Sequence, residues 1–513
     1  MVTEKNIIKK LNIEVQTPSV TVGTQFNDEI GDFFKNEIIP EMDIQLDEMA
    51  KQFPNKIVRF DHIELDIHID KSTSFKKLKP LILTALKKQI AKDTPKENRT
   101  NTVLPHVLTT AKNKGDAFLF FIEAGTYPWW YDSKKIFTKT DFQNMLEVSS
   151  FSEKLKQKLK DKHIQKRIIF QFDFEMIEAI YTAITDTKEI QHASYKVTQT
   201  SRFQSFKVPF WSSVFDYSYT KKEAGLLQKI DAIISSIAIK KNNKTTKNYQ
   251  IELSFLKEVS KIVTYINELL NLGILLKKTK QENIRLTLDK NTSPSASTTL
   301  NNETLKSIES KMVTYSRLDT NKVEDEFISI TKNDRFSTKI SDEGILVQNA
   351  GLVILHPYIP LLFERLDFLS EDSEGKLKKT IKPNKVATAV HLLHYLACRK
   401  EQPYEHELTV EKYLCGLPLE QSLERMISLS EEQKEQCNSL LKAVLDHWKA
   451  LESSNIELLQ NEFLVREGKL FFTKDTEKIY VQRKVYDLLL DKIPWNLALA
   501  KFPWKQKMIH IEW

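Results

Sequence analysis

Residues 351–369 read GLVILHPYIPLLFERLDFL, and they are followed by VATAVHLLHYLACR at residues 386–399 and YEHELTVEKYLCGLPL at residues 404–419. These stretches place an apolar run, a His-Pro break, an aromatic-rich helix and a Cys-Gly-Leu-Pro turn in succession. The middle stretch repeats apolar residues at helical spacing, with Val390, Leu393 and Ala397 on one stripe. We therefore expect residues 344–513 to form a mostly helical C-terminal domain, with a further helix at 438–451 and a short hairpin within 461–483.

Alternating patterns in the first 95 residues predict strands. Leu11, Ile13 and Val15 alternate with polar residues, and residues 62–70 read HIELDIHID, with the apolar side chains on one face. Helical spacing predicts helices over about 24–50 and 75–92, and Pro40 should kink or restart the first of them. Residues 1–95 are expected to form a small α+β unit of two strands on helices.

The centre of the chain divides into two predicted regions. Residues 96–220 form a helical region in which Gly125 ends one helix, Pro128, Trp129 and Trp130 make an apolar turn, and 138–186 is helical. Residues 193–220 have a strand- or loop-like composition. Residues 221–343 are a variable region with helices at 222–240 and 250–276 and a linker at 291–302. The expected fold is mainly α with a small α+β N-terminal unit, in a multidomain helical protein.

The composition excludes several classes of protein. Hydrophobic residues make up 41% and charged residues 28% of the 513 residues, and 11 Gly and 16 Pro are too few for collagen-like, mucin-like or fully disordered chains. The net charge of +7 comes mainly from scattered lysines. A nucleic-acid surface needs clustered basic residues with stacking aromatics. No nucleic-acid partner is therefore expected.

The cysteines and the N-terminal residues indicate the cellular compartment of the protein. Cys398, Cys415 and Cys437 are too few and too scattered for a disulfide framework, which fits a reducing compartment. The first 15 residues lack the apolar core of a signal peptide, and no apolar run approaches 18 residues. These features predict a cytoplasmic protein without membrane insertion.

Chemical motifs are weak. The sequence has no Gly-rich phosphate loop, no Gly-x-Ser-x-Gly elbow and no His-Glu-x-x-His motif. His391, His394 and Cys398 share one side of a helix, as zinc ligands would, but the spacing selects no fourth ligand. Core packing is the preferred interpretation of these three residues.

Two further groups of residues could be chemical sites, but each has a simpler structural explanation. Cys415 could act as a nucleophile with His406 or His391 as its base, but its apolar neighbours favour a buried structural thiol. The charged face of residues 62–70 suits either a divalent cation or plain solvent exposure, and solvent exposure is preferred. We therefore predict no enzyme activity, no catalytic residue, no cofactor and no metal.

Tryptophans beside prolines offer a different kind of site. Such residues anchor either the core or a partner protein, because Trp is enriched at interface hot spots. The interaction candidates are Trp129, Trp130, Trp211, His356, Pro357, Trp495, Trp504 and Trp513.

Several of these segments resemble the tape measure proteins of bacterial contractile injection systems. The N-terminal half of that family is matched by IIKKLNIEV at 7–15, VRFDHIELDIHI at 58–69 and FIEAGTYPWW at 121–130. Its C-terminal half is matched by residues 349–366, AVHLLHYLA at 389–397, KYLCGLPL at 412–419, PWNLALAKFPW at 494–504 and IEW at 511–513. The resemblance brackets nearly the whole chain and gives nothing for residues 221–343.

The resemblance implies a non-enzymatic assembly component that helps to set inner-tube length. Its partners would be inner-tube, baseplate or hub proteins, with a second copy of the chain as a further candidate, and its place would be within the assembled particle. One alternative is a compact baseplate, cap or chaperone-like assembly factor of the same particle. The other is a metal- or thiol-dependent enzyme using His391, His394, Cys398 or Cys415.

Overall fold

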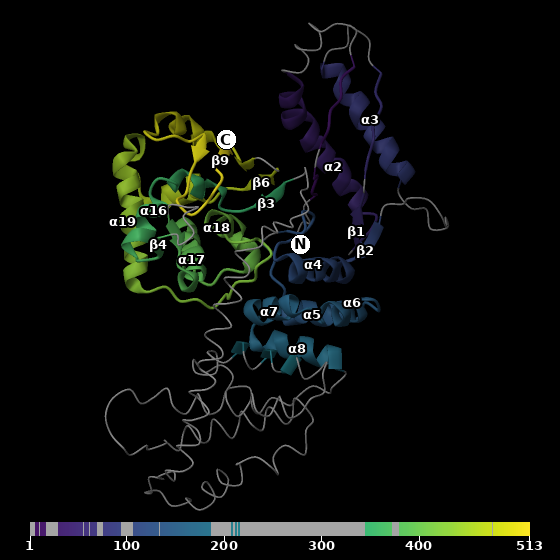
Figure 1. Ribbon diagram of the computed structural model, residues 1–513. Helices are drawn as coiled ribbons and strands as arrows, with labels where there is room; N and C mark the ends of the chain where they lie inside the picture. Colours follow the sequence, from purple (N-terminus) through teal and green to yellow (C-terminus); the bar gives the residue numbers. More distant parts are fainter. Residues whose placement is uncertain are drawn as a thin grey trace, which may run out of the picture. The chain divides into compact units, whose positions relative to one another are not determined.

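The computed structural model describes residues 6–9, 11–16, 29–54, 56–60, 62–68, 75–93, 106–132, 134–185, 207–208, 211–212, 214–215, 344–371, 379–473 and 476–513. These residues are mainly helical with a few small sheets, as expected (Figure 1). They divide into two compact units, one of Met1–Leu119 with Pro128–Phe151 and one of Phe120–Tyr127 with Ser152–Trp513. The finer boundaries at residues 95, 220 and 343 stay predictions.

The first unit is built on a helix pair. The π-helix η1 (Phe34–Ile38) leads into α2 (Ile39–Ala50), which lies beside α3 (Phe75–Asp93) (Figure 1). Pro40 sits in the first turn of α2, directly after the π-helix. A proline removes one helical hydrogen bond and crowds the preceding turn, and the wider π-turn accommodates both effects. The predicted restart at Pro40 is confirmed.

The two predicted N-terminal strands are wrong. Residues 11–16 are exposed and belong to no sheet. Residues 62–68 keep the predicted two-faced pattern, and Ile63, Leu65 and Ile67 pack against the cores beside α2 and α3, but they too belong to no sheet. Alternation sets which face is buried, whereas a strand also needs a neighbouring chain for its backbone groups.

The strands of this unit lie elsewhere. Strand β1 (Lys56–Arg59) pairs antiparallel with β2 (His106–Thr109), and α4 (Thr110–Ala124) follows. Gly125 adopts a φ of 77°, a left-handed conformation that favours glycine and ends the helix as predicted. In the first unit, Phe118 packs against Phe137, Phe142 and Phe151, near α5 (Lys139–Leu146).

Helices α6 (Phe151–Lys158), α7 (Lys162–Gln171) and α8 (Phe174–Thr185) confirm the helical prediction for 138–186. Residues 207–208, 211–212 and 214–215 are helical, so the strand- or loop-like expectation is wrong at these positions. Trp211 and Phe215, four residues apart, both contact the ring of Tyr181. Aromatic burial against α8 therefore overrides the β-forming composition. The helices predicted at 222–240 and 250–276 and the linker at 291–302 lie outside the described residues.

A five-stranded sheet runs through the C-terminal part of the second unit. Its order is β3-β6-β7-β9-β8, and only the β7–β9 pair is parallel. The strands are β3 (Ile345–Val347), β6 (Gly468–Phe472), β7 (Glu477–Val481), β8 (Leu499–Ala500) and β9 (Ile509–Glu512). The β6–β7 hairpin was predicted. The rest of the sheet was not, because β3, β8 and β9 are too short for an alternating pattern.

Short helices surround α17 (Val386–Cys398), whose stripe of Val390, Leu393 and Ala397 is fully buried as predicted. The α-helices among them include α16 (Ile359–Arg365), α18 (Thr409–Leu414) and α19 (Glu431–His447), the last beginning seven residues before its predicted start at residue 438 (Figure 1). The remaining elements are η4 (Ala350–Leu355), β4 (Leu369–Glu371), β5 (Lys379–Ile381), η5 (Pro383–Lys385), η6 (Glu405–Leu408), η7 (Lys449–Leu451), α20 (Ile456–Leu459), η8 (Gln460–Leu464) and η9 (Val485–Lys492).

A buried charge cluster ties the second unit together. The Glu405 carboxylate accepts from Arg167 Nε at 3.0 Å and from Lys412 Nζ at 2.5 Å, and all three side chains are almost fully buried. Arg167 also donates to the backbone oxygens of Ile122 and Glu123. These contacts join α7 and the end of α4 to the chain around η6.

Gly351 marks the closest approach of two elements in this unit. A Cβ built there would lie 1.7 Å from the backbone oxygen of Phe463, so η4 and η8 meet at a distance that only glycine permits. We expect Gly351→Ala to lower the free energy of unfolding by about 3 kcal/mol, because the clash is with backbone that cannot rotate away. Chemical denaturation of the purified protein measures this loss.

Gly31 supplies the matched control, since a Cβ there has no atom within 4 Å and the residue is helical. Gly31→Ala should leave stability unchanged or raise it by about 0.5–1 kcal/mol. Equal stability of the two variants would contradict the close contact at Gly351.

Candidate functional site: a tryptophan-lined pocket beside η9

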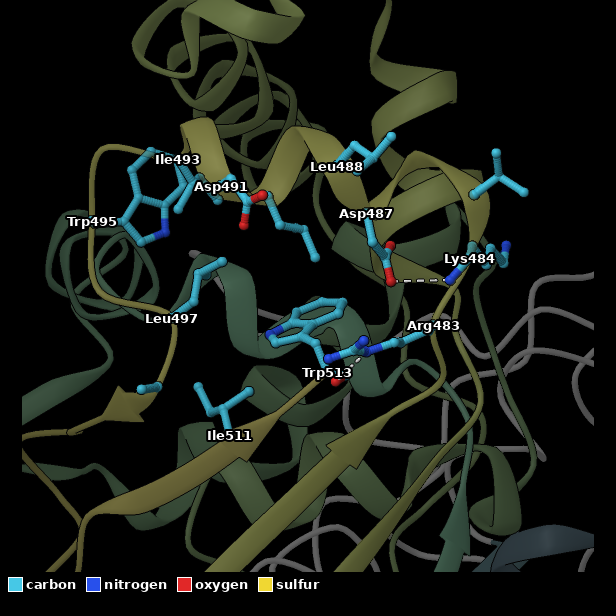
Figure 2. A pocket seen from close by; sticks show the side chains of 13 residues that line it. Arg483, Lys484, Asp487, Leu488, Asp491, Ile493, Trp495, Leu497, Ile511 and Trp513 are labelled. Carbon is cyan, nitrogen blue, oxygen red and sulfur yellow. Dashed lines mark hydrogen bonds between the residues drawn. The ribbon is translucent and has the colours of Figure 1, made fainter. Parts of the chain in front are cut away.

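The described residues of the second unit contain a pocket of about 630 Å³ beside η9 (Figure 2). Its walls come from η9, from the chain leading to β8 and from the end of β9. The lining residues are Arg483, Lys484, Val485, Asp487, Leu488, Leu490, Asp491, Ile493, Trp495, Leu497, Ala498, Ile511 and Trp513. Most of these are apolar or aromatic, as is usual for sites that bind a ligand or a partner segment.

The start of η9 is fixed by hydrogen bonds that its own residues supply. The Asp487 carboxylate accepts from the backbone N–H of Lys484 at 3.0 Å, which caps the helix. The same side chain pairs with the buried Arg466 guanidinium, 2.5 Å away. Arg466 donates in turn to the backbone oxygens of Glu462 and Gln482. This wall of the pocket is therefore tied to the sheet.

Trp513 forms the floor at the end of β9. Arg483 Nε donates to the Trp513 backbone oxygen at 2.6 Å, and the Arg466 guanidinium lies 5.2 Å from the centre of the Trp513 ring. The Trp513 Nε1 atom is buried and makes no hydrogen bond within the part of the chain that the structure describes. Buried indole donors usually have a partner, so this one is a free donor at the pocket.

Trp495 forms the opposite wall. Its Nε1 donates to the Ile354 backbone oxygen at 2.9 Å, and its ring meets Tyr358 edge to face at 5.2 Å. His356 Nε2 lies 2.8 Å from the backbone oxygen of Asn496, and burial lowers the pKa of this imidazole. The structure thus brings together His356 and Trp495, which lie 139 positions apart in the sequence. Pro357 directly follows His356.

The lip of the pocket is unusually apolar for a surface. Val485 is 88% exposed and Leu488 is 78% exposed. Figure 2 shows Asp491 on the side of Trp495, with Arg483 and Lys484 on the other side. Sequence reasoning missed Val485, Leu488 and Asp491, although the largely apolar run VYDLLLDK at 485–492, just before Pro494 and Trp495, was a signal.

The other predicted interaction tryptophans are not among the residues that line this pocket. Trp211 and Trp504 are buried in the second unit, where Trp504 Nε1 donates to the Leu414 backbone oxygen. Trp129 and Trp130 are half-buried in the first unit. The Arg59 guanidinium lies 3.5 Å from the centre of the Trp130 ring.

The three residues considered as zinc ligands have other partners. His391 Nε2 lies 2.9 Å from the Glu424 backbone oxygen, whereas His394 Nδ1 lies 3.0 Å from Glu411 Oε1 and its Nε2 lies 3.2 Å from Cys398 Sγ. Within the described ranges, no group of three or more His, Cys, Asp or Glu residues has the geometry to hold a metal ion. This search includes the exposed side chains of residues 62–68.

Cys415 is buried, and burial raises the pKa of its thiol further above neutrality. His406, considered above as a base for Cys415, stacks on Tyr127 at 3.8 Å.

None of the described helices is long and apolar enough to cross a bilayer.

The pocket thus combines apolar walls with one buried indole donor, as sites that bind a ligand or a partner segment usually do. Residues 5–513 match the family model described as contractile injection system tape measure protein. The chain belongs to this family and is a structural, assembly-related component of such a system. No curated protein and no solved structure matches it significantly.

His391 provides a pH test of the core of the second unit. Burial lowers its pKa to about 4, against about 6.5 in an unfolded chain. Between these values the unfolded chain binds the extra proton, so stability falls as pH drops from 6.5 towards 4, by about 3 kcal/mol for this group. Denaturation curves across this range measure the loss.

His391→Asn should flatten this acid limb, because the titrating group is gone. His163→Asn should keep the wild-type slope, since His163 is exposed on α7. An unchanged acid limb in His391→Asn would show that His391 does not carry the loss.

Proposed function

We propose that this chain works in particle assembly by binding, without catalytic turnover or a cofactor of its own, and that the pocket beside η9 holds a segment of another particle protein. The observation that supports this most is the exposure of Leu488 and Val485 next to two half-buried tryptophans. Apolar side chains exposed around an aromatic pocket are typical of an interface hot spot.

The charges beside the pocket suggest the chemistry of that segment. Asp491 is exposed and has no ion pair among the described residues, and the Trp513 indole lacks an acceptor. A matching segment inserts one apolar side chain, offers a backbone carbonyl to Trp513 Nε1 and places a Lys or Arg beside Asp491. We assign this segment to an inner-tube, baseplate or hub protein.

The finer role is the setting of inner-tube length. If every residue were helical the chain would reach roughly 770 Å, whereas the described residues fold into two units that are each compact. This compactness favours the second candidate, a baseplate, cap or chaperone-like assembly factor of the same particle. In both cases the chain is made in the cytoplasm, joins the particle and needs no nucleic acid.

Leu488→Asp tests the pocket. The residue is 78% exposed, so the unfolding free energy should change by less than about 0.5 kcal/mol. Co-purification of tube, baseplate or hub proteins should fall at least about tenfold, because a buried interface charge costs over 1.4 kcal/mol. Quantitative mass spectrometry of tagged protein isolated from particle-producing cells measures this.

Leu361→Asp is the matched control, because Leu361 is 55% exposed on α16 and does not line the pocket. It should keep wild-type partners. Loss of partners in both variants, or in neither, would refute the pocket as the docking site. If only a second copy of the chain co-purified with the tagged protein, the pocket would instead be a site of self-association.

The length of the particle tests whether this chain sets the length of the inner tube. Inserting about 20 residues of helical sequence at 293–302, which lie outside the described residues, should lengthen the particle by up to about 30 Å, in steps of whole tube rings. Electron microscopy of negatively stained particles measures the shift, and a deletion of equal size should shorten them. Normal assembly at unchanged length would reject the length-setting role and favour the compact assembly factor.

A further inference from the structure

Three separate segments of the second unit meet around a cysteine at the end of α17. Cys398 and His394 lie one turn apart on α17, Glu411 comes from α18, and Asn349 directly precedes η4. Asn349 Nδ2 donates to Glu411 Oε1 at 2.8 Å, and the same oxygen lies 3.0 Å from His394 Nδ1. His394 Nε2 lies 3.2 Å from Cys398 Sγ.

The carboxylate determines the charge of this cluster. Glu411 is fully buried, and its second oxygen, Oε2, has no hydrogen-bond partner among the described residues. A buried carboxylate needs a positive neighbour, and His394 is the ionisable side chain in contact with it. Burial lowers the pKa of His394, but its hydrogen bonds to Cys398 and Glu411 and the charge of Glu411 outweigh this and raise the pKa to about 10.

The imidazole ring is therefore doubly protonated at neutral pH and can donate from both nitrogens. Its Nδ1–H points at Glu411 and its Nε2–H at the sulfur of Cys398. His391, one turn earlier, is the other titratable group near His394, and it is neutral because burial lowers its pKa to about 4.

The three cysteines differ in their access to solvent. Cys398 is half-buried and sits next to the exposed Arg399, whereas Cys415 and Cys437 are buried. Burial raises the pKa of both of the buried thiols. Reactive thiols are partly exposed and lie close to a positively charged group. Of the three cysteines, Cys398 is the partly exposed one, and His394 contacts its sulfur.

We propose that Cys398 is a reactive thiol that exchanges with disulfides, and that His394 and Glu411 are positioning residues, with His394 in contact with the sulfur and Glu411 holding the imidazole in place. The Cys398 sulfur attacks one sulfur of the incoming disulfide and forms a new S–S bond with it. The old S–S bond breaks, its other sulfur leaves as a thiolate, and the Cys398 proton passes to water. Cys398 is oxidised and the leaving sulfur is reduced, so no further oxidant is needed.

The wild-type chain gives the first test. We would mix the native protein with the aromatic disulfide 5,5′-dithiobis(2-nitrobenzoic acid) at pH 7 and follow the released thiolate by absorbance. One thiol per chain should react fast, and peptide mass mapping should place the adduct on Cys398. A fast phase on Cys415 or Cys437, or reaction of all three thiols only at the rate of unfolding, would overturn the proposal.

Glu411→Gln tests the role of the cluster. Without the carboxylate His394 loses its charge at neutral pH, so the fast phase should slow about tenfold, and its dependence on pH should move to higher pH. Glu432→Gln, an exposed change on α19, should react as the wild type does. An unchanged rate and pH profile in a folded Glu411→Gln protein would remove His394 and Glu411 from the mechanism.

Cys398→Ser tests the proposal independently, in case Glu411→Gln fails to fold. It should lose the fast phase and keep wild-type stability to within about 1 kcal/mol, since only a half-buried sulfur is exchanged. A fast phase that persists in Cys398→Ser would reject the assignment, whatever the fate of Glu411→Gln.

Discussion

The second unit depends on one buried carboxylate. Glu405 lies between the Arg167 guanidinium and the Lys412 ammonium, and bringing three charges out of water is costly unless each finds partners. They do, because Arg167 reaches three backbone oxygens and Lys412 donates to those of Leu419 and Gln421. Gly125 leaves the space, since a Cβ there would lie 2.7 Å from Glu405 Oε1. Charge satisfaction, rather than apolar burial alone, thus fixes how distant segments meet.

The pocket and the cluster around Cys398 offer different kinds of contact. At the pocket, Leu488 and Val485 are exposed beside a helix whose start is held by Asp487, so a partner that bound there would lose little entropy in forming the site. At Cys398, a second buried carboxylate, Glu411, contacts His394, and His394 contacts the half-buried sulfur. One site offers shape and apolar surface, and the other offers a single polarised atom, so they can work independently within one unit.

Sequence patterns predicted what local spacing controls. The helix at 386–399, the β6–β7 hairpin and the turn at Gly125 each carry their signal within a few residues. The partners of Glu405 could not be predicted, because Arg167 lies 238 positions away and a lone buried arginine looks like any surface arginine. Residues 62–68 show the same limit, since alternation gave the correct buried face but no neighbouring strand. At the pocket, Trp495 and Trp513 were proposed from their type, whereas Leu488 was missed because apolar residues are normally expected inside.

The order of strands in the sheet has a consequence for synthesis on the ribosome. Strand β9 lies between β7 and β8, so the five-stranded sheet cannot close until residues 509–512 have left the exit tunnel. Helices α6, α7 and α8 emerge more than 200 residues earlier and must wait for the segment around Glu405. The nascent chain therefore carries unpaired charges and apolar faces for tens of seconds at roughly 5–20 residues per second, long enough for a chaperone to bind before the unit closes.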